Sequence, residues 1–74
     1  MIEKSEEYLV ELGFNQFRVR LHEDIARIEV GKEEIHKFFS NDLLDKTNNK
    51  LKEFGFKYVT LDMGGYKMGS TNLT

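Results

Sequence analysis

The stretch that decides the fold is FRVRLHEDIARIEV, residues 17–30. Apolar and polar side chains alternate in both halves of this stretch, with the two-residue period that is typical of a half-buried strand. Glu23 and Asp24 interrupt the alternation with a short polar turn. The stretch therefore predicts a β-hairpin whose strands span residues 15–22 and 25–30.

A helix is predicted on the N-terminal side of the hairpin, from Glu3 to Leu12. Its apolar residues recur at helical spacing, and the neighbouring carboxylates of Glu6 and Glu7 suit the positive end of a helix dipole. Gly13 then ends the helix, because glycine readily adopts the left-handed conformation that closes a last turn.

Two further helices are predicted on the C-terminal side. Gly31 ends the second strand, and residues 32–39 read as a short helix. Ser40 or Asn41 can cap a longer helix that runs to about Phe54.

Alternation returns at residues 57–63 and predicts a third strand, with Val59, Leu61 and Met63 facing the core. The expected fold is a small α+β domain of order α-β-β-α-β in two layers. Its three-stranded sheet is expected to be antiparallel, in the order second, first, third, with the helices on one face. The domain is assigned to residues 1–63, and the glycine-rich residues 64–74 are expected to form a C-terminal loop or tail.

Composition excludes several classes of protein. A chain of 74 residues holds one small core, and the absence of cysteine excludes disulfides and thiolate metal sites. The net charge of −2 disfavours a general nucleic-acid binder, and no apolar run reaches the length of about 20 residues that crosses a bilayer. We therefore expect a cytoplasmic protein with no membrane partner. Its residues suggest no catalytic group, and His22 and His36 have no partners at metal-ligand spacing.

Arginines are concentrated on the face of the sheet that the helices leave uncovered. Arg18 and Arg20 are two residues apart on one strand, so they lie roughly 7 Å apart and point the same way. This spacing suits a clamp on a phosphate or carboxylate, since guanidinium groups bind oxyanions bidentately. The alternative is a solvated face on which the arginines, Arg27 included, form ion pairs with Glu29 and Asp62 across strands.

The segment after the third strand is a second candidate. Residues 64–70, GGYKMGS, offer backbone N–H groups, a lysine and hydroxyls that could form a nest for an anion. The segment matches neither a P-loop nor a dinucleotide fingerprint, so the residues alone favour a frayed terminus over an anion nest.

Five phrases then occur in a characteristic order: EYLVELGF (7–14), FRVRLH (17–22), ARIEV (26–30), GFKYVTLD (55–62) and GYKMGSTN (65–72). In this order they resemble the C-terminal domain of the LarE-type ATP-dependent sacrificial sulfur transferases, which belong to the PP-loop ATP pyrophosphatase superfamily. The resemblance extends over nearly the whole chain.

The resemblance implies partners and a role. In that family an N-terminal PP-loop domain uses ATP, with Mg²⁺, to adenylate a carboxylate of a pyridinium mononucleotide. A cysteine then donates sulfur during biosynthesis of the nickel-pincer cofactor. The implied partners are therefore the chain's own PP-loop domain, further copies in a homo-oligomer, and a phosphate-bearing nucleotide substrate.

The resemblance also implies a set of site residues. Arg18 and Arg20 match a strand whose arginines bind phosphate in the family. The other positions that match the motifs are Arg27, Asp62, Tyr66, Lys67 and Ser70, and Lys67 stands where arginine is more usual.

The chain departs from the family pattern because it has neither a PP-loop nor a cysteine. It should therefore be inactive alone and bind no cofactor by itself. Two rival functions remain open. One is a protein-interaction or oligomerisation module that uses the bare sheet face. The other is a small RNA-binding domain, which the negative charge and the shortage of exposed aromatics besides Tyr58 disfavour.

Overall fold

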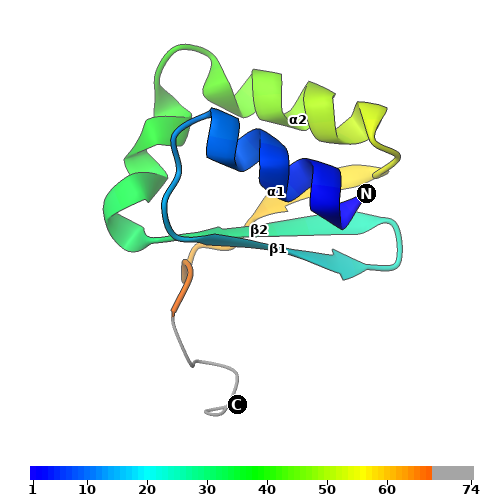
Figure 1. Ribbon diagram of the computed structural model, residues 1–74, viewed down its shortest axis with the longest axis horizontal. Coiled ribbons are helices and arrows are strands. Elements are labelled where there is room, and N and C mark those ends of the chain that lie inside the picture. The colour runs from blue at the N-terminus through cyan, green and yellow to red at the C-terminus, as the bar shows by residue number, and fades with distance from the viewer. Residues whose placement is uncertain (68–74) are drawn as a thin grey trace.

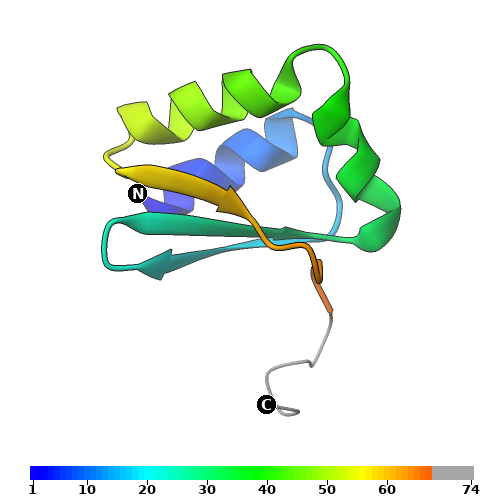
Figure 2. The ribbon, with the colours of Figure 1, turned by 180° about the vertical axis from the view of Figure 1, so that it is seen from behind.

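The computed structural model describes residues 1–67, which fold into a layer of helices on a layer of strands (Figure 1). The elements in chain order are α1 (Ile2–Glu11), β1 (Phe17–His22), β2 (Ile25–Val30), the 3₁₀ helix η1 (Lys32–Phe39), α2 (Leu43–Glu53) and β3 (Tyr58–Leu61). Both α-helices cover the same face of the sheet, and the chain after β3 leaves on the opposite side (Figures 1 and 2). The predicted α+β class and the placement of the helices are confirmed.

The strand order is β1-β2-β3, so the predicted order, with the first strand in the middle, is wrong. The hairpin is antiparallel as expected, but β3 runs parallel to β2. The reason is the connection: η1 and α2 carry the chain over the sheet and back to the start of β2, where Tyr58 pairs with Ile25. A helical crossover of this kind joins parallel strands.

Both α-helices end in the predicted way. Gly13 and Gly55 take the left-handed conformation, with φ of 96° and 115°. The N–H of the following phenylalanine, Phe14 or Phe56, then donates to a carbonyl of the last turn. At the start of α2 the prediction was wrong, because the N-cap is Asp42 and its side chain makes no capping hydrogen bond.

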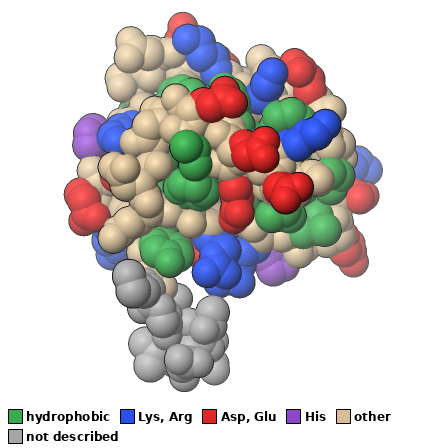
Figure 3. All heavy atoms as spheres, in the orientation of Figure 1, with side chains coloured by type: hydrophobic (Ala, Val, Ile, Leu, Met, Phe, Trp, Pro, Cys, Tyr) green, Lys and Arg blue, Asp and Glu red, His purple; other side chains and the backbone are tan. Residues whose placement is uncertain are grey.

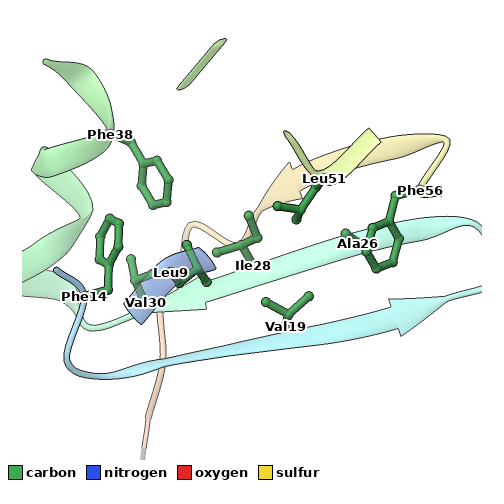
Figure 4. Close-up of a cluster of buried hydrophobic side chains, with 9 residues drawn as sticks. All are labelled: Leu9, Phe14, Val19, Ala26, Ile28, Val30, Phe38, Leu51 and Phe56. Carbon is green, nitrogen blue, oxygen red and sulfur yellow. The ribbon is translucent and has the colours of Figure 1, made fainter. Parts of the chain in front are cut away.

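The core lies between the two layers (Figure 4). It consists of Leu9, Phe14, Val19, Ala26, Ile28, Val30, Phe38, Leu51 and Phe56. The rings of Phe14 and Phe38 stack with centroids 4.8 Å apart and close the end of the core below η1.

Two apolar residues are exposed: Met63, which was predicted to face the core, and Leu21, which belongs to the apolar face of the alternating first strand. Leu21, next to the last residue of the edge strand β1, is 48% exposed, and Met63 is 84% exposed because β3 ends two residues before it. Within residues 1–67, no helix has the length and apolar character needed to span a membrane.

Candidate anion-binding site

The hairpin directs its arginines to the sheet face that no helix covers. Val19 is buried against the helices, so its neighbours Arg18 and Arg20 emerge on the opposite face by the alternation of the strand. Arg18 is exposed, whereas the side chain of Arg20 keeps only 30% of its surface exposed. The two arginines therefore share a face but differ in how tightly the protein holds them.

Arg20 is held by a network of ion pairs that extends from β1 across β2 to Asp62, the residue that follows β3. Glu29 on β2 accepts hydrogen bonds from Arg20 Nε at 3.1 Å and from Arg27 Nη2 at 2.9 Å, both at its Oε2 atom. Arg27 Nε lies 3.6 Å from the Asp62 carboxylate just beyond β3. The cross-strand ion pairs that sequence reasoning offered as the alternative are thus present for Arg20 and Arg27.

Arg18 is the arginine that this network does not use. Its Cα is directly opposite that of Glu29, yet among residues 1–67 no carboxylate lies within 4.0 Å of its side-chain nitrogens. The Nη atoms of Arg20 are also without an ion pair in the described part of the chain. The three guanidinium groups on this face therefore exceed the charge of Glu29 and Asp62, and the excess is concentrated at β1.

A groove runs along the outer edge of β1. It has a volume of about 770 Å³ and is lined by residues 17–22 together with Ile2 and Glu6 of α1. Lysine or arginine side chains, a histidine and carboxylates lie together at this edge of the molecule (Figure 3). The groove is open to solvent along its length and has a basic strand as one wall.

Glu6 is the residue of this groove that sequence reasoning assigned only to the helix dipole. Its carboxylate accepts a hydrogen bond from the backbone N–H of Val19 at 3.2 Å. Ile2 and Glu6 are one helical turn apart and so share a face of α1, which is the sequence signal that could have found them. The signal did not reveal which strand that face would meet.

The backbone that leads into β1 is fixed by another carboxylate. Glu34 of η1 accepts hydrogen bonds from the N–H groups of Asn15 at 2.9 Å and Gln16 at 3.1 Å, and from Lys37 Nζ at 3.2 Å. Burial acts to raise the pKa of Glu34, but these hydrogen bonds favour the charged form and together bring the pKa below its ordinary value. Glu34 thereby sets where the basic strand begins.

The other predicted site residues are placed unevenly. Asp62 joins the arginine network and accepts a hydrogen bond from the N–H of Gly64, which orders the turn after β3. Tyr66 is half-buried and its N–H donates to Val30 O, while Lys67 is exposed. Neither of these two residues belongs to the ion-pair network of the described residues, and Ser70 lies outside them.

Metal-ligating side chains do not gather anywhere in the described residues. Nowhere in residues 1–67 do three or more His, Cys, Asp or Glu side chains come together in a way that could hold a metal ion. No ligands for Mg²⁺ are therefore assigned to this part of the chain.

Known proteins resemble this chain closely in sequence. Pyridinium-3,5-bisthiocarboxylic acid mononucleotide synthase of Lactiplantibacillus plantarum is 47% identical over 70 residues, which are 95% of this chain and 25% of the synthase. An uncharacterized protein of Synechocystis sp. is 44% identical over 69 residues, which are 93% of this chain and 26% of that protein. No family model matches the chain.

These identities confirm the resemblance to the LarE-type sulfur transferases that the ordered motifs indicated, and they extend over nearly all of the chain. The chain spans about a quarter of the length of the curated relatives it matches.

Proposed function

We propose, with the likeness to the LarE-type sulfur transferases as the premise, that this chain is the C-terminal accessory domain of an ATP-utilising sulfur transferase. Its groove along β1 binds the phosphate group of the nucleotide substrate. ATP, Mg²⁺ and the sulfur-donating cysteine belong to the partner PP-loop domain, and no catalytic residue is assigned to this chain. The sequence identity to the synthase supports the accessory role.

The observation that carries the phosphate-binding role is the unequal state of the two β1 arginines. Glu29 holds the guanidinium group of Arg20 through Nε, which leaves both Nη atoms to face a ligand. Arg18, two residues away and exposed, supplies a second guanidinium group on the same face. Together they offer the planar, multidentate donors that phosphate oxygens favour.

The anchored arginine lowers the entropic cost of binding. Immobilising one long side chain on association costs roughly 0.5–1.5 kcal/mol. Because the bond to Glu29 already orients Arg20 in the folded chain, most of that cost falls on Arg18 alone. A preoriented donor beside an exposed one that forms no ion pair within residues 1–67 suits a site that must both select a phosphate and release it.

The size and openness of the groove support an accessory rather than an independent role. Its volume of about 770 Å³ lies within the range of roughly 300–1,000 Å³ that small-molecule sites occupy. Such sites usually enclose most of the ligand, whereas within residues 1–67 this groove is walled only by β1 and α1. We infer that the PP-loop domain supplies the opposite wall.

The rival RNA-binding function receives little support from the open face. The exposed aromatic side chain of Tyr58 on this face belongs to β3, which is the opposite edge of the sheet from Arg18. RNA-binding sheets stack successive bases on neighbouring aromatic rings. The chain also carries a net charge of −2, which disfavours a polyanion.

A chimera tests the proposed function directly. The matching quarter of the Lactiplantibacillus plantarum synthase is replaced by this chain, and sulfur transfer to the pyridinium mononucleotide is measured. We expect the chimera to be active, and Arg18→Ala in the chimera to raise KM for the nucleotide about tenfold, the effect of losing roughly 1.4 kcal/mol of binding.

The matched control is Lys46→Ala on α2, which also removes one exposed positive charge but far from the groove. It should change KM less than twofold. An inactive but folded chimera would contradict the accessory role. Equal effects of the Arg18 and Lys46 substitutions would contradict the phosphate site while leaving the accessory role intact.

A further inference from the structure

The sheet has two outer edges, and both present backbone groups that no described residue of the sheet pairs. The N–H of Gly31 donates to Gln16 O, so Gln16 directs its backbone groups toward β2. Because the direction alternates along a strand, Phe17, Val19 and Leu21 direct their N–H and C=O groups away from β2, toward the outside of the sheet. The N–H of Asp62 donates to Ile28 O, so by the same alternation Val59 and Leu61 of β3 direct their N–H and C=O groups away from β2.

The β1 edge is protected against pairing with another strand. The Glu6 carboxylate already occupies the N–H of Val19. In an antiparallel pairing of two β1 strands about a two-fold axis through residue 18, 19 or 20, at least one arginine of each copy directly faces an arginine of the other. Charged side chains on an edge strand, and like charges directly opposite, are the usual means of preventing such pairing.

The β3 edge has neither form of protection. Its residues, Tyr58 to Leu61, carry no charge, and no side chain of the described residues accepts a hydrogen bond from the N–H of Val59 or Leu61. Exposed apolar surface lies beside it, since Tyr58 is 56% exposed and Leu44 of α2 is 46% exposed. An unprotected apolar edge is a template for strand addition.

A small groove follows this edge on the helical side of the sheet. It has a volume of about 70 Å³ and lies between α2 and β3, lined by Leu44, Thr47, Val59 and Leu61 among others. The Thr47 hydroxyl oxygen in its wall is buried and has no hydrogen-bond partner among residues 1–67. The space accommodates part of an apolar side chain from an added strand.

We propose that β3 of one copy pairs antiparallel with β3 of a second copy about a two-fold axis through Thr60. In such a pairing, directly opposite residues place their side chains on the same side of the joint sheet. The outward N–H and C=O groups of Val59 and Leu61 in one copy must also lie opposite the same groups in the other copy, so that hydrogen bonds can form. One register that satisfies both conditions pairs Val59 with Leu61, Thr60 with Thr60 and Tyr58 with Asp62. It adds about four backbone hydrogen bonds between the copies.

Complementarity identifies a second copy as the occupant. In this register no like charges stand opposite each other along residues 58–62. On the open face the Tyr58 hydroxyl, a donor, faces the Asp62 carboxylate, an acceptor. On the helical face Val59 and Leu61 of both copies form one apolar strip that Leu44 borders. The side chains of β3 in one copy are thus complementary to those of β3 in a second copy.

The dimer leaves the phosphate site free. Strand β1 lies at the other edge of the sheet, beyond β2, so the groove beside Arg18 remains open in both copies. The inference therefore goes beyond the proposed function and does not depend on it. A paired segment of four residues is short, so the dissociation constant is expected to be roughly micromolar or weaker.

Sedimentation velocity over a range of concentrations tests the dimer. The wild-type chain is expected to pass from monomer to dimer, and Thr60→Lys, which places two ammonium groups opposite each other at the axis, to remain monomeric. The matched control is Leu21→Lys, which adds the same charge at the exposed end of β1 and should leave the dimer unchanged. Leu44→Lys is a second disrupting variant in case the loss of the bond from the Thr60 hydroxyl to Ala26 O prevents folding.

Amide hydrogen exchange gives a second readout. Protection of the Val59 and Leu61 amides should rise with protein concentration, while that of the Phe17 and Leu21 amides stays constant. A chain that remains monomeric at millimolar concentration overturns the proposal. A dimer that Thr60→Lys leaves intact, or that Leu21→Lys disrupts equally, overturns it as well.

Discussion

The two edges of the sheet are built from the same alternating pattern but are held in different ways. Strand β1 is surrounded by carboxylates: Glu6 binds the backbone of Val19, Glu29 orients Arg20, and Glu34 fixes the approach to the strand. Strand β3 relies on apolar contacts under α2 and on its backbone pairing with β2. The charged edge is suited to a small anionic ligand, and the apolar edge to another strand.

The two edges should also respond differently to pH. Charge-assisted hydrogen bonds to partly buried carboxylates are strong and depend on pH, whereas apolar burial is nearly independent of pH. Perturbations of the carboxylates should therefore act on the β1 side of the molecule and leave the β3 side largely unchanged.

The largest effect is expected from Glu29→Ala. Glu29 is 8% exposed and accepts hydrogen bonds from two arginines, so its removal leaves Arg20 and Arg27 without their shared acceptor. Loss of one partner from a buried ion pair costs about 3–5 kcal/mol, and exposure of these arginines reduces the expected loss to about 2 kcal/mol. Urea denaturation measures it.

Glu33→Ala is the matched control, because Glu33 is an exposed carboxylate close by in the sequence and makes no ion pair within residues 1–67. Its effect should stay within about 0.5 kcal/mol. A similar cost for both substitutions would mean that the arginine network does not hold the hairpin.

A smaller and pH-dependent effect is expected from Glu34→Gln. The substitution keeps the shape of the side chain but removes the charge that receives the N–H groups of Asn15 and Gln16, so about 1–2 kcal/mol should be lost at pH 7. The pKa of Glu34 in the folded state lies below its ordinary value of 4.5. Its stabilising contribution is therefore complete above pH 4.5 and is lost as the pH falls through the folded pKa.

The check is the free energy of unfolding of both chains from pH 7 down to the acid limit of folding. The gap between wild type and Glu34→Gln should be constant down to about pH 4.5 and then close. A gap that stays constant at lower pH would show that the charge of Glu34 contributes nothing.

The local elements could be predicted from the sequence because their signals are local. Strict alternation identified both strands of the hairpin, and Gly13 and Gly55 marked the ends of the helices, where the structure has positive φ. The α+β class and the placement of helices on one face followed from these elements.

The position of β3 could not be predicted from such signals. Val59 and Leu61 alternate in the same way whether their strand pairs with β1 or with β2, and parallel or antiparallel. The choice depends on where η1 and α2 return the chain, which is a property of the assembled fold. The same applies to Leu21 and Met63, whose apolar character did not reveal that Leu21 lies near the end of an edge strand and that Met63 lies beyond the end of β3.

The candidate site was predicted in part. The shared face of Arg18 and Arg20 followed from the period of the strand, and the chance of ion pairs with Glu29 and Asp62 from the same pattern. Which arginine would pair with Glu29 could not be deduced, because the register places Arg18 directly opposite Glu29, whereas the ion pair forms with the diagonal neighbour Arg20. The contact of Glu6 with β1 depends on how α1 packs, and periodicity does not determine that.

The most direct test of the phosphate site is a phosphate titration of the isotope-labelled chain at constant ionic strength, followed residue by residue by NMR. The site predicts saturable shifts of the Arg18 and Arg20 Nε–Hε signals and of the amides of residues 17–22, while Tyr58 to Leu61 stay unchanged. Shifts spread evenly over the surface lysines, with the two β1 arginines unaffected, would contradict it.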